Sequence, residues 1–154
     1  LEKIMKYLKI IILIVIIILL YLYLPRHSWV EQDVINELNN NYIYIPNRKS
    51  DDYFKDIIFK EQQVWKYELS EQEMKEINEY IDNGNFVRLT EDSFDYLKLW
   101  WYGSYSLVNI DFRIGFKNID VDNSYRCCVS YRGNYAEFVI DASNYNYYIL
   151  IYDS

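Results

Sequence analysis

Histidine and cysteine, on which many nucleophilic catalytic sites and most zinc sites depend, are scarce in this chain of 154 residues. His27 is the only histidine, and the only cysteines are the neighbours Cys127 and Cys128. Ser-His-Asp and Cys-His catalysis need a histidine beside the nucleophile, and a zinc site needs several His or Cys ligands. Adjacent cysteines in a strand point to opposite faces, so we expect no disulfide between them. The sequence therefore predicts a protein that is not an enzyme, with no catalytic residue, metal or cofactor.

One polar segment has the spacing of a cation site at its start. Asn118, Asp120 and Asp122 place side-chain oxygens at alternate positions, as the opening of a calcium-binding loop does. The pattern then fails, because Arg126 stands where the ninth ligand would be and Val129 where a bidentate glutamate should close the loop. We interpret the segment as a polar hairpin loop. The few glycines form no phosphate-binding pattern, so nucleotide binding has no support.

Aromatic residues are the strongest remaining signal, since the chain has 18 tyrosines, 4 tryptophans and 7 phenylalanines. Recognition surfaces favour Tyr and Trp, which bury a large area at little entropic cost and keep a polar tip. The candidate binding face combines a dense aromatic patch with tyrosines of even spacing near the C-terminus: Trp100, Trp101, Tyr102, Tyr135, Tyr148 and Tyr152. Two alternatives weaken this signal. A helix could cover the tyrosine-rich sheet face, and the AT-rich codons of a low-GC bacterial genome would raise tyrosine everywhere.

Charge is divided unevenly along the chain. Residues 28–154 contain 22 acidic and 12 basic side chains, a balance of −10, whereas residues 1–27 contribute +3. Nucleic-acid binding needs clustered Lys and Arg, so we expect no nucleic-acid partner. The acidic surplus favours a cationic partner, although solubility alone also explains it.

The N-terminal region carries a long apolar run with Lys3, Lys6 and Lys9 at its start. Residues 4–24 approach the length of a transmembrane helix, and the residues that follow lack the small side chains of a signal-peptidase site. A cleaved signal peptide is the alternative. The lysines place the N-terminus in the cytoplasm. The sequence thus predicts an uncleaved signal anchor of a single-pass plasma (inner) membrane protein, with the lipid bilayer as partner of residues 4–24.

Two parts follow from this interpretation: a cytoplasmic stub with the anchor over residues 1–27, and one extracytoplasmic domain over residues 28–154. Capping boxes predict a helix over residues 28–41, from Ser28 and Glu31, and another that begins at Ser70 with Glu73. Thr90 caps a further short helix. Predicted strands cover residues 42–45, 59–69, 85–89, 108–116, 125–131, 135–141 and 145–152. The predicted fold class is α+β: an N-terminal transmembrane helix, then a small domain in which two or three helices pack on a four-stranded antiparallel meander formed by the last four strands.

Two functions remain open at this level. The preferred one is a membrane-anchored module of the cell envelope that binds another envelope or secreted protein, as an accessory or protective factor. The alternative is carbohydrate binding or glycan processing at the cell surface. A shallow tyrosine surface would favour a protein partner, whereas a cleft with Trp100 or Trp101 flanked by two carboxylates would favour a sugar. The sequence does not determine the oligomeric state.

Overall fold

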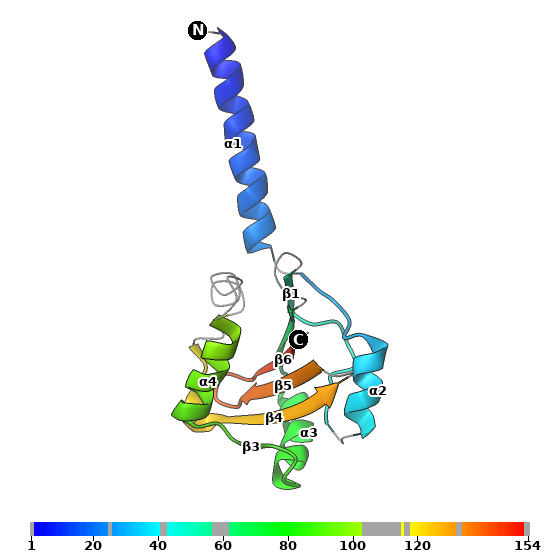
Figure 1. The fold of residues 1–154 in the computed structure, drawn as a ribbon. Coiled ribbons are helices and arrows are strands. Elements are labelled where there is room, and N and C mark those ends of the chain that lie inside the picture. The colour runs from blue at the N-terminus through cyan, green and yellow to red at the C-terminus, as the bar shows by residue number, and fades with distance from the viewer. Residues whose placement is uncertain are drawn as a thin grey trace.

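The computed structural model describes residues 2–24, 26–40, 43–56, 62–102, 115, 118–131 and 134–152. A long helix, α1, projects from a domain built around one antiparallel sheet (Figure 1). The helices are α1 (Glu2–Tyr23), α2 (Gln32–Asn40), α3 (Glu71–Asp82), α4 (Glu91–Tyr102) and the 3-10 turn η2 (Val121–Asn123). The strands are β1 (Asp52–Asp56), β2 (Gln62–Glu68), β3 (Val87–Arg88), β4 (Ser124–Tyr131), β5 (Asn134–Asp141) and β6 (Asn146–Tyr152).

Within the described residues, the sheet has six strands in the order β1-β2-β6-β5-β4-β3, and every neighbouring pair is antiparallel. The predicted four-stranded meander is therefore wrong. Strands β4, β5 and β6 do pair in succession, but β2 pairs with β6 across a long stretch of chain and brings β1 with it. Periodicity along one segment carries no information about such a pairing. The predicted strand at 108–116 lies outside the described residues except at Gly115, and residues 43–45 are not in a strand.

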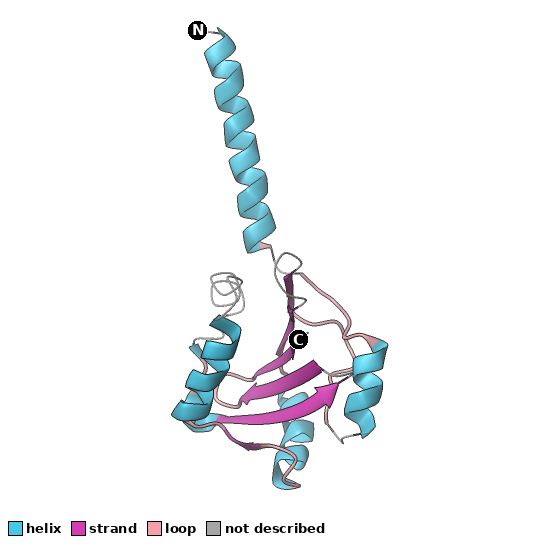
Figure 2. Cartoon of the chain, in the orientation of Figure 1, coloured by secondary structure: helices cyan, strands magenta, loops and turns pink. Residues whose placement is uncertain are grey.

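Helices pack on both faces of the sheet (Figure 2). Successive side chains of a strand point to opposite faces, so Tyr147 and Tyr148 of β6 belong to two different cores. The core with Tyr147 includes Val34 of α2 and Ile77 of α3. The core with Tyr148 contains side chains of α4, of the sheet and of the region around η2: Val64, Leu89, Phe94, Leu97, Ile119, Val121, Val139 and Leu150. Residues 147–151 of β6 are therefore buried on both faces of the sheet.

Two of the three predicted helix starts are confirmed. At α3, the Ser70 hydroxyl accepts a bond from the Glu73 amide at 3.2 Å, and the Glu73 carboxylate accepts one from the Ser70 amide at 2.8 Å. At α4, Thr90 and Ser93 exchange the equivalent bonds. In both helices the residues that make the cap are close neighbours in the sequence.

The predicted cap at Ser28 is wrong, because α2 begins only at Gln32. The Ser28 amide donates to the Ser50 hydroxyl at 3.2 Å, and the Ser28 carbonyl accepts from the Ser50 amide at 2.8 Å. The backbone at Ser28 is thus held by a distant segment. This tertiary contact outweighs the local capping pattern, which has the same spacing as the one that does operate at α3.

The predicted membrane anchor is corrected by the structure. Over the described ranges, no helix is both long enough and apolar enough to span a bilayer. Lys3, Lys6 and Lys9 lie in the first half of α1, and the uncharged part of this helix, from Ile10 to Tyr23, is 14 residues long. At about 1.5 Å per residue this part covers roughly 21 Å, which is shorter than the ~30 Å hydrocarbon thickness. The single-pass anchor, the plasma-membrane location and the inside-to-outside topology are corrected with it.

Candidate functional site

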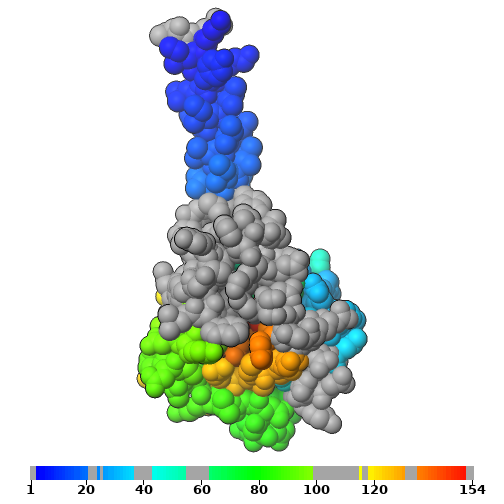
Figure 3. All heavy atoms as spheres, in the orientation of Figure 1, coloured from blue at the N-terminus to red at the C-terminus, as the bar shows by residue number. Residues whose placement is uncertain are grey.

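The structure describes two side chains of the predicted aromatic binding face, those of Tyr135 and Tyr148. Tyr148 is only 2% exposed and packs in the core under α4, so a helix covers the sheet face at this position. Tyr135 is 47% exposed and pairs in register with Tyr152 of β6. The remaining predicted residues end α4, and their side chains, like that of Tyr152, lie outside the described ones: Trp100, Trp101 and Tyr102. The orange patch in Figure 3 belongs to β5, the strand of Tyr135, and it is exposed on this face of the molecule.

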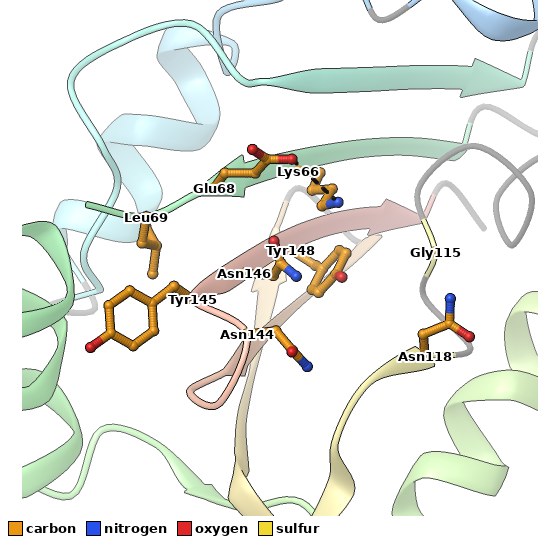
Figure 4. A pocket seen from close by; sticks show the side chains of 9 residues that line it. All are labelled: Lys66, Glu68, Leu69, Gly115, Asn118, Asn144, Tyr145, Asn146 and Tyr148. Atoms are coloured by element: carbon orange, nitrogen blue, oxygen red, sulfur yellow. Dashed lines mark ion pairs between the residues drawn. The ribbon is translucent and has the colours of Figure 1, made fainter. Parts of the chain in front are cut away.

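A polar groove lies where β2 and β6 approach Gly115 and Asn118. We call it the asparagine groove, and its volume is about 470 Å³. Its lining residues are Lys66, Glu68, Leu69, Gly115, Asn118, Asn144, Tyr145, Asn146 and Tyr148. Figure 4 shows Leu69 and Tyr145 at one end and Gly115 and Asn118 at the other, with the ring of Tyr145 pointing away from the remaining side chains. Lys66, Asn146 and Tyr148 lie between these ends.

The turn between β5 and β6 positions one end of the groove. The carboxylate of Asp141, which is buried, accepts bonds from the Asn144 backbone amide at 3.3 Å and from Asn144 Nδ2 at 2.7 Å. Tyr145 follows with a φ of 55°, a left-handed conformation that is rare for a bulky residue. The Tyr145 carbonyl accepts a bond from the Leu69 amide at 2.7 Å. These bonds hold the strained turn against the end of β2, so the groove has a fixed wall there.

The polar segment from Asn118 to Asn123, whose spacing is that of the start of a calcium-binding loop, supports the same β5–β6 turn. The Asp120 carboxylate accepts bonds from Asn123 Nδ2 at 2.8 Å and from the Ser143 hydroxyl at 2.5 Å. The bonds from Asn123 and Ser143 lower the pKa of Asp120. In the part of the chain that the structure describes, no group of three or more His, Cys, Asp and Glu side chains could hold a metal ion. The segment therefore ties η2 to the β5–β6 turn through hydrogen bonds.

The charges of the described lining residues balance. Lys66 Nζ lies 3.7 Å from the Glu68 carboxylate, and these are the two charged side chains among the lining residues that the structure describes. Three amide side chains, those of Asn118, Asn144 and Asn146, provide most of the other polar groups. A carboxamide offers two N–H donors and a carbonyl acceptor at one place. The described lining of the groove therefore presents donors and acceptors together without a net charge.

A second and smaller pocket lies on the opposite face of β2, beside α2. We call it the Trp29 pocket; its volume is about 160 Å³, and its lining residues are Trp29, Val30, Ile35, Ile45, Pro46, Asn47, Arg48 and Tyr67. Arg48 forms one wall and bonds to Glu73 at 2.9 Å, to Asp51 at 2.8 Å and to the Glu68 carbonyl at 2.8 Å. The bond to Glu73, reinforced by Asp51, raises the pKa of Arg48 although burial opposes it. The guanidinium is thus fixed in place.

The two cysteines are free, and Cys128 is the more exposed of the two. Partial burial of its thiol raises the pKa of Cys128 to about 11, and the neighbouring Glu137 carboxylate raises it as well. Glu137 itself is paired with Arg126 at 2.6 Å. A thiol with this pKa is protonated at neutral pH, so the cluster lacks the thiolate that nucleophilic catalysis requires.

Sequence reasoning missed both sites because neither has a motif. The groove takes residues from β2, from the β5–β6 turn and from the positions of Gly115 and Asn118, and the pocket joins Trp29, Arg48 and Tyr67. Arg48 falls between the predicted strands at 42–45 and 59–69, where the sequence predicts no helix or strand. The one available signal for the groove is the pair of asparagines that flank residue 145, and this composition is equally typical of a turn.

Comparison of the chain with protein-family models, with curated proteins and with solved structures finds no match.

Proposed function

We propose that this protein is a binding module that takes a neutral, hydroxyl-rich ligand of the carbohydrate type in the asparagine groove. The observation that carries the proposal is the lining of the groove: three amide side chains beside a Lys66–Glu68 pair of opposite charge. Sugar hydroxyls donate and accept hydrogen bonds at the same atom. Amide side chains match such groups, and a site without net charge gives no advantage to an ionic ligand.

The size and wall of the groove support the same proposal. A volume of about 470 Å³ lies within the range of small-molecule sites, which runs from about 300 to 1,000 Å³. The wall at Asn144 and Tyr145 is fixed by bonds to Asp141 and Leu69. A fixed wall lowers the entropy that a ligand must lose on binding.

The groove favours glycan binding over glycan hydrolysis. Glycosidases place two carboxyl groups on either side of the scissile bond. Glu68 is the one carboxylate among the lining residues that the structure describes, and it faces Lys66. The described lining residues of the groove include neither Trp100 nor Trp101, and they do not supply the paired carboxylates that processing would use.

The experiment is a glycan array probed with the full chain, followed by calorimetry on the best ligand. We expect Asn118→Ala and Asn146→Ala each to weaken binding about fivefold to tenfold, the value of one neutral hydrogen bond. Asn36→Ala is the matched control, because Asn36 is exposed on α2 outside the groove and its side chain accepts a bond from Gln32. Equal affinity in all three variants, or no glycan bound at all, would refute the proposal.

Protein recognition remains a second candidate function, favoured by a different observation. Trp29 is 52% exposed and lines an apolar pocket, on a domain with an acidic surplus. An exposed Trp beside a pocket is typical of the positions that dominate protein interfaces.

A further inference from the structure

Tyr67, which lines the Trp29 pocket, carries a buried hydroxyl that no described residue satisfies. Tyr67 is fully buried, lines the pocket, and its hydroxyl has no hydrogen-bond partner within the described ranges. Burial raises the pKa of Tyr67, so the hydroxyl stays protonated and can both donate and accept. A buried polar group without a partner is unusual in a folded protein and calls for a partner from outside.

Tyr147 is a buried tyrosine of the same core whose hydroxyl does have a hydrogen-bond partner. It is the neighbour of Tyr67 across the β2–β6 pair, with ring centroids 6.4 Å apart, and it is equally buried. Its hydroxyl donates to the Tyr44 carbonyl at 2.8 Å. Of these two buried tyrosines, Tyr67 lines the pocket, and its hydroxyl is the one without a partner among the described residues.

The rest of the pocket fits an aromatic ring. Its volume of about 160 Å³ is close to the ~150 Å³ of an apolar cavity that accepts benzene. Val30, Ile35, Ile45 and Pro46 give apolar walls. A ring with a hydroxyl at its tip would fill this space and pair with Tyr67, whereas a ring without one would leave the Tyr67 hydroxyl unpaired.

Charge determines the kind of molecule that carries the ring. Acidic side chains lie around the pocket: Glu31 is exposed two residues after Trp29, and Asp51 and Glu73 flank Arg48. The Arg48 guanidinium is already bonded to both of these carboxylates and to a backbone carbonyl of β2. With the balance of −10 over residues 28–154, this favours a polypeptide with basic residues.

We propose that the Trp29 pocket receives the side chain of a tyrosine from a basic partner polypeptide, with the tyrosine hydroxyl bonded to Tyr67. Trp29 covers the ring from the rim. This site is separate from the asparagine groove, and the proposal does not depend on the ligand of that groove.

The test titrates the full chain with capped tripeptides and follows the amide resonances of Trp29 and Tyr67 by NMR. We expect Lys-Tyr-Lys to bind about tenfold more tightly than Lys-Phe-Lys, because only the former pairs with the Tyr67 hydroxyl. In Tyr67→Phe this preference should disappear, while Trp29→Ala should weaken both peptides. Tyr96→Phe, which removes a hydroxyl at an exposed position of α4, is the matched control and should keep the preference.

Three results would overturn the proposal. The first is no binding of Lys-Tyr-Lys at millimolar concentration. The second is a preference for tyrosine that survives in Tyr67→Phe. The third is p-cresol bound as tightly as Lys-Tyr-Lys, or Glu-Tyr-Glu bound as tightly, since either would show that the basic polypeptide contributes nothing to recognition.

Discussion

Removing the hydroxyl from Tyr67 and from Tyr147 should have opposite effects on stability. Both side chains are fully buried in the same core, and each change to Phe deletes one oxygen. The Tyr147 hydroxyl donates to the Tyr44 carbonyl at 2.8 Å, whereas the Tyr67 hydroxyl has no partner in the described part of the chain. The pair therefore isolates the contribution of one hydrogen bond with little change in packing.

The magnitudes follow from these contacts. Tyr147→Phe loses a hydrogen bond and leaves the Tyr44 carbonyl without its partner, which costs about 1 to 2 kcal/mol of unfolding free energy. Tyr67→Phe removes a group that is desolvated without compensation in the folded state, so the free energy of unfolding should stay the same or rise by up to about 1 kcal/mol.

The assay is urea denaturation of the full chain, followed by far-UV circular dichroism. With a slope of about 2 kcal/mol per molar urea, Tyr147→Phe should lower the midpoint by roughly 0.5 to 1 M, and Tyr67→Phe should not lower it. A midpoint that falls equally in the two variants would refute the reasoning. It would show that the Tyr67 hydroxyl is satisfied within the folded chain, and the Trp29 pocket would then lack its polar contact.

Two further predictions concern the supports of the sites. Burial acts to raise the pKa of Glu73, but the bonds from Arg48 and Ser70 outweigh burial and lower this pKa. These bonds stabilise the fold fully at a pH above the ordinary Glu pKa. Their contribution to stability is lost as the pH falls through the lowered pKa of Glu73. Between about pH 5 and about pH 3, the urea midpoint of the wild type should fall further than that of Glu73→Gln; parallel curves would contradict this. Leu97→Ala should cost about 2 to 5 kcal/mol, because Leu97 is buried on the sheet face under α4. Val87→Ala, at a 62% exposed position, is the control and should change the midpoint little, and a similar small effect for Leu97 would show that α4 does not cover that face.

Local patterns in the sequence predicted local structure well. The capping box of Ser70 and Glu73 marks the start of α3, and β4, β5 and β6 lie close to the strands predicted over residues 125–131, 135–141 and 145–152. In each case the residues that determine the element are neighbours in the chain. The equivalent pattern at Ser28 fails for the opposite reason, because the partner that holds it is Ser50, 22 residues away.

Features that depend on distant segments could not be predicted from periodicity. The pairing of β2 with β6 places Lys66 opposite Tyr148 and Tyr67 opposite Tyr147, and no sequence pattern encodes this register. Both candidate sites depend on it, since the groove and the pocket each take residues of β2. Tyr148 illustrates the consequence. Its even spacing with Tyr152 indicated a binding face, but α4 covers it.

Strand β2 also explains why the two sites can be tested independently. Lys66 and Glu68 line the asparagine groove, whereas Tyr67 between them lines the Trp29 pocket, because successive side chains of a strand point to opposite faces. A change confined to the Tyr67 hydroxyl leaves the β2–β6 register and the groove side chains in place. Tyr67→Phe should therefore keep the glycan affinity of the wild type, and Asn146→Ala should keep the tyrosine preference of the pocket. If either variant affected both ligands, the two surfaces would have to be treated as one coupled site, and the separate assignments would fail.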